Sequence, residues 1–183
     1  MTAKKPSRLA LLALCCAGAC LVAREARADV SSWVGMGFGP SSLTTDGSNS
    51  VVPSLRFETG MGSSPRAPMA VGGLLGFQAH FGHSADLSLS LRSATRGYVD
   101  GGWGIAMDIG GYHRFGEVSN GVLGSLTLGA PWGLTLAGGA SAGLGGARSV
   151  YTLIGFDFAR LTVYRRTGGR WWPNPQPGFH VAR

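Results

Sequence analysis

The chain has 183 residues, enough for one domain, with 31 glycines, 14% charged residues and a formal net charge of +7. Its 44% hydrophobic content excludes a disordered chain, and so few charges would leave an ordinary soluble domain short of polar surface. The positive charge does not indicate a nucleic-acid partner. Without residues 1–28, eleven arginines face eight acidic residues, and no basic stripe or RNA-binding motif remains.

Residues 1–28 have the organisation of a cleaved secretory signal peptide. Lys4, Lys5 and Arg8 form a basic start, residues 9–23 are uncharged and largely apolar, and residues 26–28 supply an A-x-A cleavage site. The apolar run is shorter than the roughly 20 residues of a membrane-spanning helix. We therefore predict that the protein is exported and that this segment is then removed. An N-terminal membrane anchor is the alternative.

All three cysteines, Cys15, Cys16 and Cys20, lie inside this leader. The mature chain is therefore predicted to contain neither a disulfide nor a thiolate metal site. Residues 17–20 are similar to a bacterial lipoprotein box, although Ala17 stands where a large aliphatic residue is expected. Lipidation of Cys20 is left open.

After the leader, apolar residues alternate with small or polar residues in runs of about ten, the pattern of outer-membrane β-strands. Eight runs are predicted, over Val30–Phe38, Ser50–Met61, Met69–Phe81, Ser84–Ala94, Gly102–Arg114, Gly121–Ala130, Gly133–Ala142 and Ser149–Tyr164. Turn-forming residues separate them, and a bulge near Ala159 and Arg160 would keep the last run in phase. The expected fold is all-β: a closed, antiparallel, up-and-down transmembrane β-barrel of about eight strands over residues 29–165, followed by an irregular tail at 166–183.

The polar faces of these strands distinguish a membrane barrel from a soluble sandwich. A sandwich would turn its apolar side inward and would more often carry lysine and glutamate outside. Small residues with a few opposite charges suit the narrow interior of an eight-stranded barrel, where buried charges must pair. Solvated surface pairs are the alternative. The predicted lumen charge cluster comprises Arg56, Glu58, His80, Asp86, Arg92, Asp108, Asp157 and Arg160.

Aromatic residues fall near the predicted strand ends, as they do at a lipid interface. With a periplasmic N-terminus, the periplasmic girdle would contain Trp33, Tyr98, Trp103, Trp132 and Tyr164. The outer girdle would contain Phe38, Phe81, Phe115 and Tyr151. Both girdles are predictions of lipid-facing side chains.

Residues 155–164 alternate apolar side chains and end on Tyr164, which is similar to the C-terminal strand signal of outer-membrane barrels. Together with the eight runs, residues 29–164 resemble the small OmpA/OmpX-type barrels of Gram-negative bacteria. The resemblance implies a monomer in the outer membrane, surrounded by lipid, and an encounter with the barrel-assembly machinery during biogenesis. It identifies no individual member, and a shared fold does not fix a function.

Candidate chemical sites are weak. His80 and His83 lie three residues apart, so on a strand they would point to opposite faces, and no metal site is predicted. The glycine-rich segments 35–39 and 138–143 open no helix and lack a Lys-Ser/Thr ending, so no phosphate-binding cofactor site is predicted. A lipid-modifying enzyme would need a serine held by a histidine, and no enzyme motif surrounds the candidates Ser84, Ser88, His80, Asp86 and His113.

The leading functional prediction is a non-enzymatic outer-membrane barrel with a structural or interaction role. Any ligand, whose identity the sequence does not give, would bind the outer loops at 39–49 and 115–120. The alternatives are a narrow pore, a lipid-modifying barrel enzyme, and a secreted or lipid-anchored soluble β-protein.

Overall fold

The structure is a computed structural model that describes residues 30–45, 47–63, 67–116 and 119–162. The predicted leader at 1–28 with Cys20, the girdle residue Tyr164 and the tail at 166–183 lie outside the described residues. Within the described part of the chain, no helix is long and apolar enough to cross a membrane.

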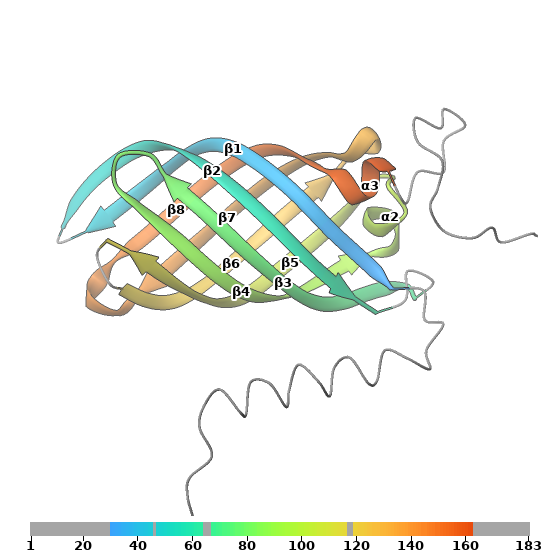
Figure 1. Ribbon diagram of the computed structural model, residues 1–183, viewed down its shortest axis with the longest axis horizontal. Coiled ribbons are helices and arrows are strands. Elements are labelled where there is room, and N and C mark those ends of the chain that lie inside the picture. The colour runs from blue at the N-terminus through green and yellow to red at the C-terminus, as the bar shows by residue number, and fades with distance from the viewer. Residues whose placement is uncertain (1–29, 46, 64–66, 117–118, 163–183) are drawn as a thin grey trace, which may run out of the picture.

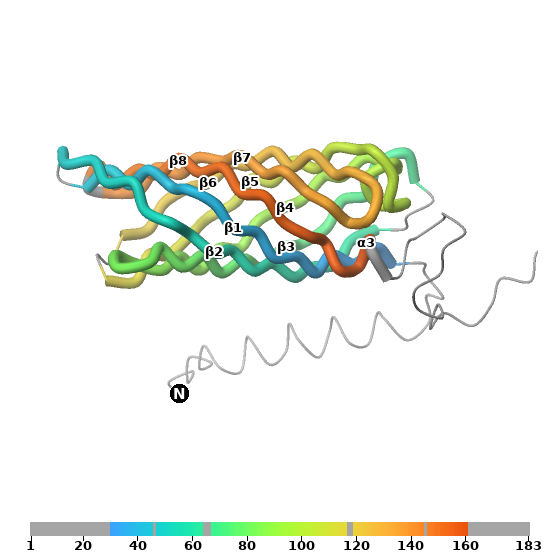
Figure 2. Tube along the Cα trace, turned by 90° about the horizontal axis from the view of Figure 1, so that it is seen from above, coloured from blue at the N-terminus to red at the C-terminus, as the bar shows by residue number. Residues whose placement is uncertain are grey.

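The chain folds into one closed antiparallel barrel of eight strands, as predicted. Each strand pairs with the next, and β1 pairs with β8 to close the sheet (Figures 1 and 2). The strands are β1 Ser31–Thr45, β2 Ser48–Gly62, β3 Met69–His80, β4 Ser84–Thr95, β5 Gly104–Phe115, β6 Ser119–Gly129, β7 Leu134–Gly143 and β8 Arg148–Asp157. Closure leaves no open sheet edge along the shared body of the barrel.

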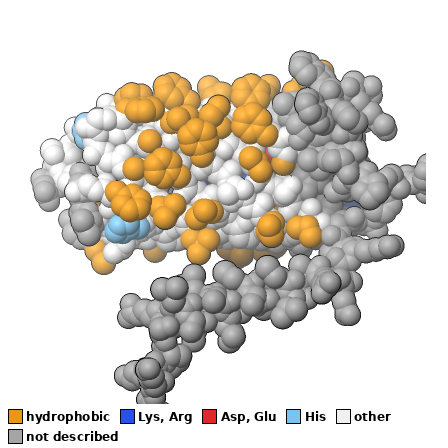
Figure 3. Space-filling view, in the orientation of Figure 1, with side chains coloured by type: hydrophobic (Ala, Val, Ile, Leu, Met, Phe, Trp, Pro, Cys, Tyr) orange, Lys and Arg blue, Asp and Glu red, His pale blue; other side chains and the backbone are white. Residues whose placement is uncertain are grey.

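Alternation along the strands separates apolar from charged side chains. Leu89, Ile105 and Phe156 point outward and are 68%, 44% and 44% exposed, whereas Arg92 and Asp108 point inward and are 0% and 1% exposed. Figure 3 shows hydrophobic side chains spread over the outer wall, with almost no charged atoms at that surface. An apolar core enclosed by a polar exterior, which a soluble sandwich requires, is therefore wrong for this chain.

Both ends of the described chain lie at one end of the barrel, together with the short helices α2 (Arg96–Val99) and α3 (Phe158–Thr162) (Figure 1). The opposite end carries short hairpin connections. Between β3 and β4 the chain reverses over residues 81–83, where Gly82 adopts a φ of +80° that L side chains disfavour. A 3-10 turn at Leu144–Gly146 links β7 to β8 at this end, whereas the 3-10 turn at Pro131–Gly133 links β6 to β7 at the end that carries α2.

The predicted outer loop at 39–49 is wrong, because most of it is strand. β1 continues to Thr45 and β2 begins at Ser48, so only two residues separate them. Thr44 Oγ1 donates to Asn49 Oδ1 at 2.6 Å, and Ser48 Oγ donates to the Thr45 carbonyl at 2.8 Å. These side-chain bonds stabilise the tip of a long hairpin from residues that also favour turns. The predicted loop at 115–120 is also shorter, since β5 ends at Phe115 and β6 begins at Ser119.

The predicted continuation of the last strand to Tyr164, with a bulge near Ala159 and Arg160, is also wrong. β8 ends at Asp157, and Phe158–Thr162 form α3. Asp157 Oδ1 accepts hydrogen bonds from the backbone N–H groups of Ala159 (3.0 Å) and Arg160 (3.2 Å). A carboxylate that captures these donors is a helix N-cap, so the chain leaves the sheet at this residue.

Three predicted girdle aromatics face inward instead of outward. Trp33 is 1%, Tyr98 0% and Tyr151 5% exposed. Trp33 and Tyr151 occupy the inward phase of their strands, opposite to the exposed Val34 and Ile154, while Tyr98 lies on α2. The predicted girdle residues that are exposed are Phe38, Phe81, Trp103, Phe115 and Trp132.

Candidate functional site

The barrel interior is the candidate site, because it gathers most of the charged side chains that the structure describes. Its polar groups form two connected clusters along the lumen, and an apolar cluster closes the end that carries α2. The charged residues of the two polar clusters come from strands β2 to β5, whereas small residues predominate at the inward positions of β6 and β7.

The central cluster is built around Arg92 on β4. Arg92 Nε donates to Asp108 Oδ1 at 2.7 Å and its Nη2 donates to Asp108 Oδ2 at 2.9 Å, a bidentate pair. Ser125 Oγ also donates to Asp108 Oδ2 at 2.8 Å. Arg92 Nη1 lies 2.9 Å from Glu58 Oε1 on β2, so one guanidinium joins two acids. Planar bidentate contacts of this kind are the strongest hydrogen bonds available to a buried arginine.

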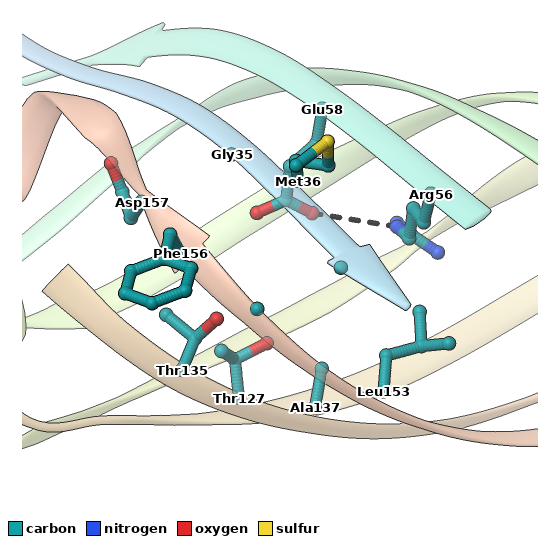
Figure 4. Close-up of a pocket in the computed structure, with 12 residues that line it drawn as sticks. Gly35, Met36, Arg56, Glu58, Thr127, Thr135, Ala137, Leu153, Phe156 and Asp157 are labelled. Carbon is teal, nitrogen blue, oxygen red and sulfur yellow. Dashed lines mark ion pairs between the residues drawn. The ribbon is translucent and has the colours of Figure 1, made fainter. Parts of the chain in front are cut away.

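Arg56 extends this cluster toward β8. Its Nε lies 3.4 Å from Glu58 Oε2, and its Nη1 donates to the Tyr151 hydroxyl at 2.8 Å. Beside Glu58 there is a cavity of about 20 Å³, also lined by Asp157 (Figure 4). A space of that size holds about one water molecule. Side chains therefore fill most of the lumen at this level.

The second cluster lies nearer the hairpin end and joins Ser54, His80, Asp86 and Arg114. Ser54 Oγ is 2.8 Å from His80 Nδ1, and His80 Nε2 is 3.2 Å from Asp86 Oδ2. Arg114 holds the same carboxylate in a bidentate contact, from Nε at 2.7 Å and from Nη2 at 2.9 Å. The turn at Gly82 thus brings Asp86 close to His80 across the β3–β4 hairpin, at diagonal positions: His80 pairs with Ser84, and Asp86 pairs with Gln78.

Ser54, His80 and Asp86 follow the order of a catalytic serine, histidine and carboxylate, but their surroundings favour a structural role. Ser54 and His80 are 0% and 2% exposed, and the cavity beside Asp86 measures only about 10 Å³. A nucleophile must contact its substrate, and this serine meets only protein. The serine bonded to His80 is Ser54, neither of the two serines that the sequence suggested.

An apolar cluster closes the opposite end of the lumen. It is formed by Trp33, Ala70, Leu74, Ala94, Tyr98, Val99 and Ala106. The guanidinium of Arg92 lies 5.7 Å from the Trp33 ring centroid, so the central charges rest directly on this cluster. Helix α2 supplies Tyr98 and Val99, and burial raises the pKa of the Tyr98 phenol, which stays neutral.

Arg160 connects α3 to other segments at this closed end. It donates to the backbone carbonyls of Tyr98 (2.7 Å), Leu134 (3.3 Å) and Gly102 (2.5 Å). Its guanidinium also lies 4.4 Å from the Tyr98 ring centroid. One side chain therefore connects three segments that close the barrel, a role that no strand pattern could indicate.

The structure brings six of the eight predicted lumen residues into the two polar clusters: Arg56, Glu58, Arg92 and Asp108 in one, His80 and Asp86 in the other. Asp157 and Arg160 are also buried but belong to the α3 end. Sequence reasoning missed Arg114, which shares the inward phase of Asp108 and Tyr112 on β5. Extending that phase by one more position would have found it.

The candidate metal residues are arranged for other contacts. His80 is bonded to Ser54 and Asp86, while the backbone N–H of His83 donates to the His80 carbonyl in the turn. In the part of the chain that the structure describes, no three His, Cys, Asp or Glu side chains are grouped to hold a metal ion. Two arginine–carboxylate clusters and an apolar closure are arrangements that rigidify a barrel.

No protein-family model matches the chain, and no curated protein matches its sequence. Among solved structures, the chain is similar to Ail, the attachment invasion locus protein of Yersinia pestis, crystallised in complex with the heparin analogue sucrose octasulfate. The TM-score is 0.45 and the sequence identity 11%, over 69% of this chain and 95% of that one.

Proposed function

We propose that this chain is a non-enzymatic β-barrel of a bacterial outer membrane, exported by residues 1–28, with a sealed lumen and a structural or interaction role. One observation carries the proposal: the exposed wall is apolar, while the charges meet inside. Exposing such an apolar wall to water costs free energy, whereas lipid acyl chains are as apolar as the wall. A closed sheet also satisfies the hydrogen bonds of every backbone group in the membrane-spanning segment.

The exposed aromatics support an orientation in this membrane. Trp103 and Trp132 adjoin the end with α2 and α3, and Phe81 and Phe115 adjoin the hairpin end. Aromatic residues at both margins of an apolar band are typical of outer-membrane barrels. With the end that carries α2 and α3 in the periplasm, the hairpins would face the exterior.

A sealed lumen is favoured over a narrow pore. The central arginine–carboxylate pairs lie across the interior, the cavities beside them measure about 20 and 10 Å³, and Tyr98 with its neighbours closes one end. A water-filled channel needs a continuous wide path, which larger barrels provide. We therefore expect no ion conductance in the native state.

The interaction role is proposed for the β1–β2 hairpin. β2 pairs with β3 only from Ser54 onward, so Ser48–Val52 pair with β1 and extend beyond β3. Val51 is 74% exposed on this extension. A projecting strand edge can accept a strand from another protein through backbone hydrogen bonds.

Two measurements test the proposal on the full chain expressed in a Gram-negative host. Fractionation followed by gel electrophoresis should place the protein in the outer membrane, with a mobility that changes when the SDS sample is boiled. Planar-bilayer recording should then show no discrete channels. A soluble fraction without a mobility shift would refute the membrane assignment, and stable unitary currents would refute the sealed lumen.

A further inference from the structure

A groove on the outer wall interrupts the apolar surface of the barrel. It measures about 570 Å³ and is lined by Leu75, Leu87, Leu89, Gly111 and His113, with other residues of β4, β5 and β6. It is shallow and opens outward over most of its extent.

The register explains why the groove lies here. Leu75 of β3 pairs with Leu89 of β4, and Leu89 pairs with Gly111 of β5. Across these three neighbouring strands, two leucine side chains are therefore followed by a position that has no side chain. In the next row toward the hairpin end, Leu87 pairs with His113. Gly111 therefore forms the floor, and the leucines and the histidine stand beside it.

A polar pair marks the hairpin end of the groove. His113 Nδ1 lies 2.7 Å from Asn120 Oδ1, and the His113 ring packs edge-on against Phe115 with centroids 4.8 Å apart. Asn120 uses its amide oxygen for the histidine, which leaves its NH₂ group to donate elsewhere. Polar groups beside an exposed aromatic lie at the level expected for the headgroup region.

We propose that this groove holds one acyl chain of an outer-leaflet lipid, whose ester or amide carbonyl accepts a hydrogen bond from Asn120. The proposal rests on the proposed membrane location. In a bilayer, lipid tails gain no hydrophobic driving force from a protein wall, so an occupant must be held by close packing and hydrogen bonds. An unfilled hollow would forfeit the dispersion contacts of its walls, and a single unbranched chain fits an apolar groove that continues the lipid-facing wall.

Gly111 offers a clean way to fill the groove. A Cβ at this position would meet no atom closer than the Gly121 carbonyl oxygen at 3.6 Å, an ordinary contact. Gly111→Leu should therefore fold while its side chain covers the floor of the groove. Gly73 supplies the matched control: it faces outward on β3 beside Leu91, outside the groove, and a Cβ there would meet nothing within 4 Å.

The test is native mass spectrometry of the full chain released from vesicles of phosphatidylethanolamine and phosphatidylglycerol. As the collision energy increases, the wild type and Gly73→Leu should retain one bound lipid. Gly111→Leu should lose this lipid at the low collision energy that removes loosely bound lipids. Asn120→Ala should lower the retained fraction about fivefold, the equivalent of one hydrogen bond. Boiling-dependent gel mobility of the same samples reports insertion separately, so failure of the membrane proposal is distinguishable.

Two outcomes would overturn the inference. Equal lipid retention by the wild type and Gly111→Leu would mean that only loosely bound surrounding lipid contacts the wall. A dimer present in the wild type and absent from Gly111→Leu would assign the groove to a second copy of the chain.

Discussion

Removal of the negative charge at Asp108 tests whether the lumen is dry. Asp108→Asn keeps the shape of the side chain, and it takes one negative charge away from a guanidinium that is fully buried. Breaking a buried ion pair by removing one partner typically costs about 3–5 kcal/mol. Arg92 still has Glu58 as a partner at 2.9 Å in this variant. We therefore expect a loss of stability at the lower end of that range, about 3 kcal/mol, which is roughly a hundredfold in the folding equilibrium.

The assay is urea unfolding in lipid vesicles, followed by the folded fraction on unboiled gels. Asp100→Asn is the control, since its partner Arg96 is 52% exposed and such pairs contribute at most about 1 kcal/mol. Arg92→Met and the double variant Asp108→Asn/Arg92→Met complete a double-mutant cycle. The double variant should lose about 1–3 kcal/mol less stability than the two single variants lose together. A loss below about 1 kcal/mol for Asp108→Asn would show that water screens these charges, which contradicts the sealed lumen.

Three further predictions concern other parts of the barrel. Arg160→Met should lower stability by about 2–4 kcal/mol, because it removes three charge-assisted bonds to backbone carbonyls; urea unfolding measures this, and a neutral result would contradict the closing role. Gly139→Val should prevent or weaken folding, because its Cβ would collide with the ring and hydroxyl of the interior Tyr151, while the outward Gly138→Val should fold normally on unboiled gels. In single-tryptophan variants, brominated lipid should quench Trp103, which is 76% exposed, and spare Trp33, which is 1% exposed; equal quenching would refute the assignment of the two faces.

The strand pattern predicted the barrel well, because side-chain alternation has a fixed period of two. Val34, Leu89 and Ile105 lie on the outward face for that reason, and the same phase carries Arg92 and Asp108 inward. Trp33 was misassigned through its residue type: its position near a strand end suggested a girdle, whereas its phase relative to Val34 pointed inward. Phase is the stronger constraint, since a one-residue shift would turn every neighbouring side chain to the wrong face.

The ends of the strands were harder to predict, because they depend on contacts between distant residues. Thr44, Thr45 and Ser48 suit a turn as well as a strand, and β1 and β2 extend through them because each strand offers the other a hydrogen-bonding partner. At the other end, Asp157 could continue the alternation, but as an N-cap it begins α3. The contacts of Arg160 with residues about 60 positions away have no local signal at all.

The polar lumen raises a physical question, since a well-packed apolar interior would often be at least as stable as buried ion pairs. An apolar interior, however, would make each strand apolar on both faces. β4, for example, would become a run of apolar residues in which Arg92, Ser88 and Ser90 no longer interrupt Leu87, Leu89 and Leu91. Such runs favour aggregation before the barrel closes and approach the signal that inserts helices into a membrane. The interior charges interrupt such runs along the sequence, and their pairing offsets the cost of burying them once the barrel has closed.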